Sequence, residues 1–538
     1  MLKKRVWRPI GLTVFFLALI SVCLFFYSLL KVDLLLDEYL QLIAAVLVFF
    51  LYFTGVMLFY GMKRKRSVMR RVRRIIGIFL AIVQIAACLY GAVFLFRLDQ
   101  TKREFSTKPE GQLRAIVGVY VKDDDPAQSI TDMGTYRYAV LGELGNEKIN
   151  TNYAIAQIRD QIGADVTAVS YSGITDAAAA LRDGEVSAMA VNKSFLPLLN
   201  DTESFQGFAD TLRLIEEIRV PEETQEDSTV SLHGAAQPEK KDNTLAPTPE
   251  PTPSPTPRPL FGEDETLVFF ISGVDKFEAG LSNTHSDVNI LMLVNTTTRQ
   301  ILLINTPRDC FVDNPALGGG DKLTHCGIQG VENSIAALEN FYGIDIDNYV
   351  KVNFNGFETF IHAIDGITLN NPVAFSALGA DDKIYHYPQG EITLSWEEAL
   401  AYVRERESFG SGDLARGQNH LRVLTAMINK VRSSGPSLMM QYADIMKWMG
   451  DNFETDLTSE QISDLVKIAS RNLDDWDIKS YGTSGYSGMR VTASGGSEPL
   501  YIIWPQQESV DFASRLMNMM INNEVITDDT LAEAPPIF

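Results

Sequence analysis

Four charged residues, Asp275, Asp287, Arg308 and Asp309, lie at the ends of apolar segments that have the composition of β-strands. In open α/β sheets, ligands bind at the ends of the strands. A single charged residue at such a position usually caps a strand or forms a surface ion pair. Because three neighbouring segments carry such groups, the pattern predicts a binding site at one end of a sheet.

A second group of charges surrounds a glycine-rich turn at residues 409–412. Arg404 and Arg406 precede this turn and Arg416 follows it, within an otherwise acidic part of the chain. Arginine presents a planar fork of donors that matches the oxygens of a phosphate group. The alternative is a surface network between these arginines and the neighbouring glutamates.

Together, the two groups predict a site for a divalent cation and a phosphate-bearing anion. Asp275 and Asp287 would be hard oxygen ligands in a chain with only six His, which favours Mg²⁺, or alternatively Mn²⁺, over zinc. The arginines would hold phosphate oxygens and stabilise the charge that develops in phosphoryl transfer. The chain has no Gly-x-x-x-x-Gly-Lys-Ser/Thr run, which argues against a nucleotide-driven motor.

These residues need a sheet and helices to bring them together. The apolar, β-rich segments 266–272, 288–294 and 300–305 predict three strands, and residues 396–403 and 421–431 have the apolar spacing of helices. Further on, the sequence predicts helices at 438–449, 459–470 and 510–521, strands at 476–481 and 500–504, and a disordered tail at 526–538.

The first hundred residues predict a membrane anchor. Three apolar stretches, 10–30, 39–60 and 75–96, contain no Asp, Glu, Lys or Arg, and each has about the ~20 residues that a helix needs to cross a bilayer. Three such stretches in succession argue against buried core helices and against a cleaved signal peptide. We therefore expect residues 1–100 to form three transmembrane helices.

Charge sets the expected orientation of this anchor. Residues 1–104 contain 16 Lys and Arg against five Asp and Glu, whereas the whole chain carries a net charge of −21. The basic residues precede the first span and fill the loop between the second and third, so the N-terminus is expected in the cytoplasm and the bulk of the chain outside the cell. The anionic bulk argues against binding nucleic acid.

Two more regions separate the anchor from the charged motifs. Alternating strands and helices at 105–220 predict a small accessory α/β domain, in which residues 180–191 resemble the helix–glycine–strand step of solute-binding domains. A purely structural or docking domain is the alternative. Residues 221–263 are polar and carry alternating prolines, so we expect a disordered linker with polyproline II character.

The motifs together resemble the catalytic domain of the LytR-CpsA-Psr family, the cell-wall glycopolymer ligases of mainly Gram-positive bacteria. The resemblance covers residues 266–435, within an expected domain of 264–525. The matching pieces are Gly273-Val274-Asp275, Ser286-Asp287, Pro307-Arg308-Asp309, Asp321-Lys322-Leu323-Thr324-His325, Val352-Asn353-Phe354-Asn355-Gly356-Phe357, Ala399-Leu400-Ala401-Tyr402-Val403-Arg404-Glu405-Arg406 and Gly412-Asp413-Leu414-Ala415-Arg416-Gly417.

The resemblance implies a fold and an activity. The expected fold class is α/β: three transmembrane helices, a small extracellular α/β domain and a C-terminal α/β/α catalytic domain. The domain would bind a polyprenyl-pyrophosphate-linked glycopolymer, with its lipid in an apolar pocket, and transfer the glycopolymer phosphate to a peptidoglycan hydroxyl. The alternative is a membrane-anchored binder of lipid phosphate or glycan, or a regulator of wall assembly, that does not catalyse transfer.

The resemblance also implies roles for single residues. Asp275 and Asp287 would hold Mg²⁺, or one of them would act as the base, and these two residues with Arg308 and Arg404 would form the catalytic group. Asp309 and Asp413 would orient arginines. The expected phosphate ligands are Arg308, Lys322, Arg404, Arg406, Arg416 and His420.

Some residues depart from the family pattern. Lys276 stands where Arg or Ser is commoner, Val288 and Cys310 where Thr is usual, and His420 where Gln is frequent. Cys310 and Cys326 lie 16 positions apart beside the same motifs, in an oxidising exterior. They could form a disulfide that pins the loop 311–324, and two separate buried thiols are the alternative.

Overall fold

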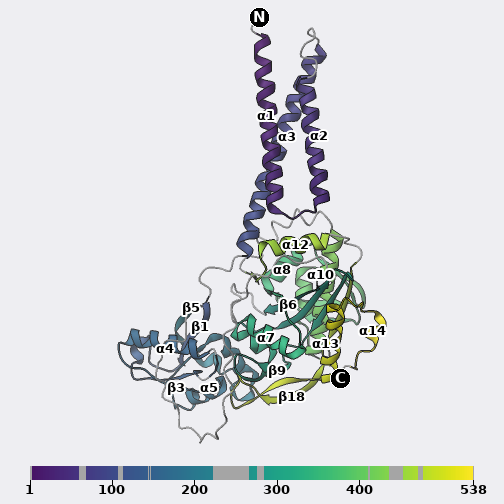
Figure 1. The fold of residues 1–538 in the computed structure, drawn as a ribbon. Helices are drawn as coiled ribbons and strands as arrows, with labels where there is room; N and C mark the ends of the chain where they lie inside the picture. The colour runs from purple at the N-terminus through teal and green to yellow at the C-terminus, as the bar shows by residue number, and fades with distance from the viewer. Residues whose placement is uncertain are drawn as a thin grey trace.

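The computed structural model describes residues 3–59, 68–106, 113–142, 144–145, 147–221, 266–274, 284–409, 412–434, 452–470 and 476–536. Asp275, Lys276, the expected linker and the expected helix at 438–449 therefore lie outside the described residues. The chain has three parts: a rod of helices, a large α/β domain directly beneath it and a smaller α/β domain beside the large one (Figure 1).

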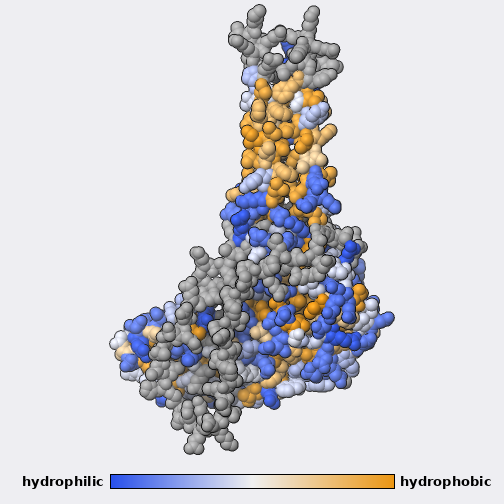
Figure 2. Space-filling view, in the orientation of Figure 1, coloured by the Kyte–Doolittle hydropathy of each residue, from blue (hydrophilic) through white to orange (hydrophobic). Residues whose placement is uncertain are grey.

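The rod consists of three helices that are long and apolar enough to cross a membrane, which confirms the three predicted spans. Its middle carries a continuous hydrophobic band, and hydrophilic side chains gather where the rod meets the large domain (Figure 2). Lipid can replace water around such a band because every backbone group of a helix is bonded within the helix. The helices are α1 (Lys3–Val32), α2 (Asp37–Phe59) and α3 (Val68–Ser106).

The small domain contains a five-stranded sheet in the order β3-β2-β4-β1-β5. Side chains on β1 alternate between two cores: Val117, Val119 and Val121 lie on one face and Tyr120 on the other, as expected for a strand that is buried on both sides. The bounds are β1 (Leu113–Lys122), β2 (Arg137–Val140), α4 (Glu147–Ile162), β3 (Thr167–Ser170), α5 (Ile174–Arg182), β4 (Ala188–Asn192) and β5 (Leu212–Pro221), with 3-10 turns η1 (Ile130–Met133), η2 (Lys193–Asp201), η3 (Glu203–Phe205) and η4 (Ala209–Thr211).

The large domain is built on a six-stranded mixed sheet in the order β16-β11-β6-β7-β8-β17. The central strand β7 runs antiparallel to its two neighbours, β6 and β8. On the outer sides, β11 runs parallel to β6 and β17 runs parallel to β8. The strands are β6 (Thr266–Val274), β7 (Val288–Asn295), β8 (Gln300–Asn305), β11 (Asn348–Asn353), β16 (Phe453–Thr455) and β17 (Asp477–Gly482).

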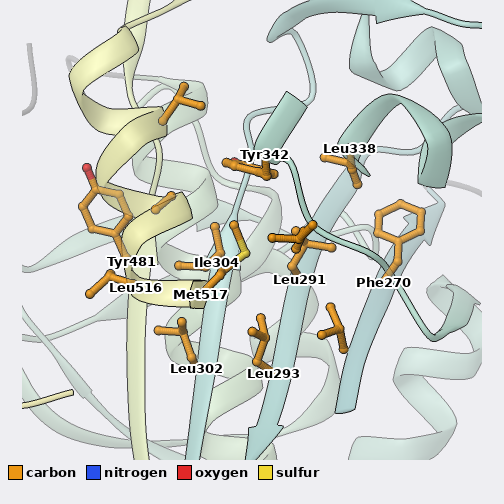
Figure 3. Packing of buried hydrophobic residues seen from close by; sticks show 14 of the residues in the cluster. Phe270, Leu291, Leu293, Leu302, Ile304, Leu338, Tyr342, Tyr481, Leu516 and Met517 are labelled. Atoms are coloured by element: carbon orange, nitrogen blue, oxygen red, sulfur yellow. The ribbon is translucent and has the colours of Figure 1, made fainter. Parts of the chain in front are cut away.

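Helices cover both faces of this sheet. On one face, Phe270, Leu291 and Ile304 pack against Leu338 of α7 and Leu516 of α13 (Figure 3). On the other face, the alternate strand residues pack against α10 and α12. The period of two along each strand therefore produces the α/β/α arrangement. The helices are α6 (Leu323–Cys326), η5 (Gly327–Gln329), α7 (Val331–Tyr342), α8 (Phe354–Ala363), α9 (Trp396–Arg404), α10 (Asp413–Ser434), α12 (Ser459–Ser470), α13 (Gln507–Ile521) and α14 (Asp528–Ala532).

Four antiparallel pairs lie outside the central sheets, and one of them replaces an expected loop. The pair β9–β10 occupies most of the segment that a disulfide was expected to pin. The pairs are β9 (Phe311–Asn314) with β10 (Gly319–Lys322), β12 (Ile367–Asn371) with β15 (Gly390–Leu394), β13 (Phe375–Leu378) with β14 (Ile384–Tyr387), and β18 (Gly485–Val491) with β19 (Pro499–Pro505).

The prediction of a disordered tail at 526–538 is wrong for the described residues up to 536. Ile526 is buried, and its backbone N–H and C=O bond to the side chain of Gln300 at 2.8 Å each. The short helix α14 follows, and Leu531 and Ala534 pack against the main core. The tail is acidic and short, but its few apolar residues cover the end of the sheet.

The anchor rests on one helix of the large domain. Val466 of α12 packs against a small apolar cluster at the lower end of the rod, which includes Leu29 and Leu98. Lys467 of the same helix pairs with Asp33, in the turn between α1 and α2, at 2.7 Å. The α12 side of the domain therefore faces the membrane end of the molecule (Figure 1).

Candidate active site

The site lies at the end of the sheet where β6, β8, β11 and β17 finish and β7 begins. Asp287 immediately precedes β7, and Arg308 follows β8, the antiparallel neighbour of β7. Their side chains meet, with Arg308 Nη1 2.5 Å from Asp287 Oδ1. The sheet therefore brings together two residues that are 21 positions apart in sequence.

Asp309 lies on the other side of the Arg308 guanidinium, with 3.6 Å between its Oδ2 and Arg308 Nε. Burial opposes the charge of Arg308, but Asp309 and Asp287 raise its pKa above the ordinary value. Arg308 is therefore a permanent cation that is fixed between two carboxylates.

The N-terminus of α10 adds a second arginine centre. Asp413 lies in its first turn, 2.5 Å from Arg416 Nη2 and 3.6 Å from Arg406 Nη2. Gly417 lets α10 approach the sheet, because a Cβ there would lie 2.3 Å from the side-chain nitrogen of Asn305. This glycine therefore places Arg416 beside the end of β8.

The carboxyl of Asp413 has an unusual pKa. Burial and repulsion by Asp309 raise this pKa to about 6, despite the opposing attraction of Arg406 and Arg308. The group around Arg308 and the group around Asp413 thus influence each other electrostatically, although they come from different strands and helices. Asp413 contacts both Arg406 and Arg416.

Arg404 is the last residue of α9. Its guanidinium carbon is 5.0 Å from the centre of the Phe354 ring, at the start of α8. Ser395 and Glu398 form a capping box at the start of α9, and the buried residues Leu400 and Tyr402 hold the helix in the domain. Arg404 is thus an exposed cation held by a rigid, capped helix.

The charged groups line one end of a cavity of about 620 Å³. Most of its wall is apolar and comes from β11, α8 and α10. The lining includes Asp287, Arg308, Arg404, Arg406, Arg416 and His420, with Val350, Val352, Phe354, Phe357, Phe360, Val423, Leu424 and Met427 among the apolar residues. A cavity of this kind fits a molecule with a long apolar part and an anionic end.

The aromatic wall of the cavity follows from the start of α8. Asn353 caps this helix, because its side-chain oxygen accepts a hydrogen bond from Gly356 N at 2.9 Å. Phe354, Phe357 and Phe360 then recur every three residues and share one helix face. The motif Asn353-Phe354-Asn355-Gly356-Phe357 was predicted only as a family marker, although its spacing already indicates an aromatic stripe.

His420 also lines the cavity, but as a neutral group. Burial lowers its pKa to about 4, although a hydrogen bond to the backbone of Val403 favours the charged form. At neutral pH, His420 can therefore contribute a hydrogen bond but no charge.

The expectation that Lys322 binds phosphate directly is corrected by its position. Lys322 is only 3% exposed and is not among the residues that line the cavity. Its ammonium lies 2.8 Å from Asp201 of the small domain and 3.3 Å from Asp309. Lys322 therefore lies outside the cavity wall, where its ion pair with Asp201 joins the two domains.

His285 lies beside the same network. Burial and the neighbouring His325 lower its pKa to about 4, and its Nε2 has no hydrogen-bond partner among the described residues. The sequence interpretation treated His285 as structural, and its position next to Ser286-Asp287 was the signal that it lies near the site.

The expected metal ligands are Asp275 and Asp287. Among the described residues, no group of three or more His, Cys, Asp or Glu could hold a metal ion, and Asp275 lies outside them. Asp287 lines the cavity and contacts Arg308 through its Oδ1. One carboxylate with substrate phosphates is a donor set that Mg²⁺ uses, so the described residues fit the ion only together with a phosphate ligand.

The predicted disulfide between Cys310 and Cys326 is not formed. Both cysteines are free thiols that are buried in the main core. Cys326 Sγ lies 3.8 Å from the carbonyl oxygen of Lys322, one helical turn earlier. The intervening segment is held instead by the backbone pairing of β9 and β10, so it needs no crosslink.

A family model described as the LytR_cpsA_psr family matches residues 224–493, which is half of the chain. The chain belongs to the LytR-CpsA-Psr family. The match contains every described residue that lines the charged end of the cavity. It stops before β19 and α13, which complete the same α/β domain in this chain.

Several curated relatives are named polyisoprenyl-teichoic acid–peptidoglycan teichoic acid transferase TagU. The protein from Oceanobacillus iheyensis is 30% identical over 233 residues, which cover 41% of this chain and 70% of that protein. The one from Bacillus subtilis is 31% identical over 217 residues, covering 40% and 68%. The one from Enterococcus faecalis is 32% identical over 207 residues, covering 38% and 65%.

Solved structures of LytR-CpsA-Psr proteins also resemble this chain. The crystal structure of B. subtilis TagU is 25% identical and covers 49% of this chain and all of that one, with a TM-score of 0.37. A structure of TagT bound to LI-WTA is 24% identical and covers 48% and 91%, with a TM-score of 0.39.

Proposed function

We propose that this chain is a membrane-anchored phosphotransferase that moves a glycopolymer phosphate from a polyprenyl-pyrophosphate carrier to peptidoglycan. One observation carries this proposal: the arginines Arg308, Arg404, Arg406 and Arg416 line a cavity whose wall is mostly apolar. The apolar part suits a polyprenyl chain and the arginine end suits a pyrophosphate. The activity named for the curated relatives supports the same reaction.

The reaction is a substitution at phosphorus. A hydroxyl oxygen of the peptidoglycan sugar forms a bond to the phosphorus that bears the glycopolymer, and the bond from this phosphorus to the bridging oxygen breaks. Polyprenyl phosphate leaves, and the hydroxyl proton passes to a base. The products are a glycopolymer joined to peptidoglycan by a phosphodiester and a polyprenyl phosphate that stays in the membrane.

The arginines provide electrostatic stabilisation for this step. Negative charge grows on the bridging oxygen and on the leaving phosphate, and fixed cations in a desolvated site stabilise such charge without reorganising. The N–H groups at Nε of Arg308 and Arg416 are buried and have no hydrogen-bond partner among the described residues. The guanidinium groups are therefore not saturated by protein acceptors, which supports their role as anion ligands.

Mg²⁺ is proposed as the cofactor, held by Asp287 together with Asp275 and the pyrophosphate, with Mn²⁺ as the alternative ion. When bound, the ion neutralises phosphate charge and polarises the phosphoryl group. Removing divalent cations with a chelator should abolish transfer, and added Mg²⁺ should restore it. Full transfer in the presence of chelator would contradict the proposed cofactor.

The proposed reaction takes place outside the cell, at the membrane surface. The basic residues in the first turns of α1, and those between α2 and α3 and at the start of α3, favour a cytoplasmic N-terminus, and three crossings then place both α/β domains outside. The contact between α12 and the lower end of the rod supports a position close to the membrane for the cavity. A lipid-linked substrate could then enter without leaving the bilayer completely.

The bound lipid offers a direct test. The full chain is purified from its native membranes in mild detergent, and the lipids that co-purify are identified by mass spectrometry. We expect a polyprenyl phosphate or pyrophosphate with wild type, and its loss in Met427→Trp, which fills the apolar part of the cavity. Met489→Trp, at an exposed position on β18, is the matched control and should retain the lipid. Equal lipid content in the two variants would contradict the assignment of the cavity.

The alternative function, a binder or regulator without transfer, makes the same prediction for bound lipid. The two functions differ in turnover, because a binder would hold the lipid-linked glycopolymer without forming the phosphodiester. The described carboxylates Asp287 and Asp413 beside the arginines favour catalysis, since simple anion binding would be weakened by them.

A further inference from the structure

The small domain is docked onto the large domain through the start of α5. Ile174 N and Thr175 N donate hydrogen bonds to the carbonyls of Ser494 and Gly495, at 3.3 and 2.9 Å. These carbonyls belong to the connection between β18 and β19. The first N–H groups of a helix have no partner within the helix, so this connection of the large domain satisfies them. The same two regions lie side by side in Figure 1.

Side chains fix the docking further. Asp176 of α5 accepts hydrogen bonds from the backbone N–H and the hydroxyl of Ser497, at 3.2 and 2.5 Å. Buried Glu147 of α4 accepts one from Gln329 of the large domain at 3.2 Å. The small domain therefore has a fixed position against the large one.

One interdomain contact leads towards the candidate active site. Asp201, the last residue of η2, pairs with the ammonium of Lys322 at 2.8 Å. A buried ammonium needs a counter-charge, and Lys322 is 3% exposed. Burial raises the pKa of Asp201, but attraction by Lys322 outweighs burial and holds this pKa below its usual value. Asp201 is thus a carboxylate that the small domain supplies to the large one.

The ion pairs continue from Lys322 to the cavity. Lys322 Nζ is 3.3 Å from Asp309 Oδ1, and Asp309 Oδ2 is 3.6 Å from Arg308 Nε. Arg308 in turn contacts Asp287, which lines the cavity. Five charges of alternating sign therefore run from the small domain to the proposed phosphate site.

We propose that Asp201 is a positioning residue of the phosphate site, which acts through Lys322 and Asp309 on the guanidinium of Arg308. This inference rests on the proposed function, since it assigns Arg308 to pyrophosphate binding. The small domain is then a structural part of the active site and not only a module that sits beside it.

The physical reason is a relay of fixed contacts. Lys322 contacts both Asp201 and Asp309, with Asp201 nearer. Without the charge of Asp201, the ammonium of Lys322 loses the partner that fixes its position, and without Lys322 the contact with Asp309 is lost directly. In both cases Asp309 is no longer held from behind, so the guanidinium of Arg308 loses its fixed orientation towards the phosphate site.

The test measures binding of inorganic pyrophosphate to the full chain in detergent, by isothermal titration calorimetry. Asp201→Asn keeps the shape of the side chain and removes its charge, and Lys322→Gln breaks the same pair from the other side. Each should weaken pyrophosphate binding by roughly tenfold, the order expected within one ion-pair network. The double variant should be no weaker than either single variant, because both break one chain of contacts.

Two controls separate positioning from docking. Asp176→Asn alters a carboxylate of the same interface that contacts Ser497 and has no link to Arg308, and it should leave pyrophosphate binding unchanged. Melting temperatures of all variants report whether the domains remain folded and docked. Weaker pyrophosphate binding in Asp201→Asn and Lys322→Gln, with unchanged binding in Asp176→Asn, would support the proposal.

The remaining outcomes overturn it. Pyrophosphate binding that is unchanged in Asp201→Asn and Lys322→Gln would remove Asp201 from the site while leaving the proposed function intact. Equal losses in Asp201→Asn and Asp176→Asn would reduce Asp201 to a docking contact. If wild type bound no pyrophosphate, the proposed function would fail, and the inference that rests on it would fail too.

Discussion

Arg404 differs from the other arginines of the site because it is exposed at the end of α9 and stacks on Phe354. A lysine at this position could neither stack in the same way nor present two parallel donors to a phosphate. We therefore expect Arg404→Lys to lower the rate of transfer by roughly 10²–10³-fold, as for the loss of one preorganised donor.

The control for this prediction is Arg432→Lys, near the end of α10, where the arginine bonds to Asn429 and does not line the cavity. It should leave the rate unchanged. Full transfer by Arg404→Lys would remove Arg404 from the phosphate site.

Asp413 allows a prediction of pH dependence. Its pKa is raised to about 6 in the folded chain, above the ordinary value of about 4 for an unfolded aspartate. The folded state therefore binds the proton more tightly, so the stabilisation from protonated Asp413 is complete below about pH 4 and is lost as the pH rises through about 6. The loss is on the order of 2–3 kcal/mol.

Asp413→Asn has no such proton to lose. The stability of wild type relative to this variant should therefore fall as the pH rises from 4 to 7, measured from melting temperatures of the detergent-solubilised chain at each pH. A stability difference that stays constant or grows over this range would show that the carboxyl is not held in the buried, repelled state that the structure describes.

At the scale of elements, the hairpin β9–β10 holds its own two ends together by backbone pairing, without a bond between Cys310 and Cys326. Cys310 precedes β9 and Cys326 ends α6, and each fills part of the core as a small apolar residue. We expect alkylation of the denatured chain without reductant, followed by peptide mapping, to find both cysteines modified separately. A linked peptide pair that disappears on reduction would contradict the structure here.

The central strands β6, β7 and β8 could be predicted from sequence because each is a short apolar run between polar residues. The hairpin β9–β10 could not, since β10 contains Gly319 and Gly320 and has little strand character of its own. Its pairing depends on distant partners: Phe311 stacks on Trp504 of β19, with ring centres 5.3 Å apart. Strand formation there is decided by tertiary packing.

The helices illustrate the same limit. Residues 352–357 matched the family pattern, but the sequence interpretation did not predict that α8 would turn its phenylalanines into the cavity. A spacing of three along one helix predicts a shared face, yet it cannot say whether that face meets the core or a ligand. The arginines at the end of α9 and at the start of α10 were easier to identify from the sequence as candidate ligands. Clustered positive charges in an acidic domain require a partner.

At the scale of the whole molecule, the sequence predicted the order of the parts but not their contacts. Asp201 and Lys322 are 121 positions apart, and neither the acidic small domain nor the lysine motif indicates that they pair. Lys322 was assigned to phosphate only because the family resemblance implies that role. The counter-charge came from another domain.

The anchor gives a prediction at this scale. If the N-terminus is cytoplasmic, an external protease added to intact cells should degrade both α/β domains and leave only the membrane rod. The motivation is the concentration of basic residues at the cytoplasmic ends of the spans. Protection of the large domain in intact cells, with digestion only after lysis, would place the site on the wrong side of the membrane for peptidoglycan.

The measurement that tests the account most directly is a transfer reaction with the purified full chain. A polyprenyl-pyrophosphate carrier with a label in its glycopolymer is incubated with peptidoglycan and Mg²⁺, and the label is followed by mass spectrometry. The account predicts a phosphodiester between labelled glycopolymer and peptidoglycan, one polyprenyl phosphate released for each bond formed, and loss of both products in Arg308→Gln. Label that stays on the lipid, although wild type binds it, would contradict the transferase and leave a binding protein in its place.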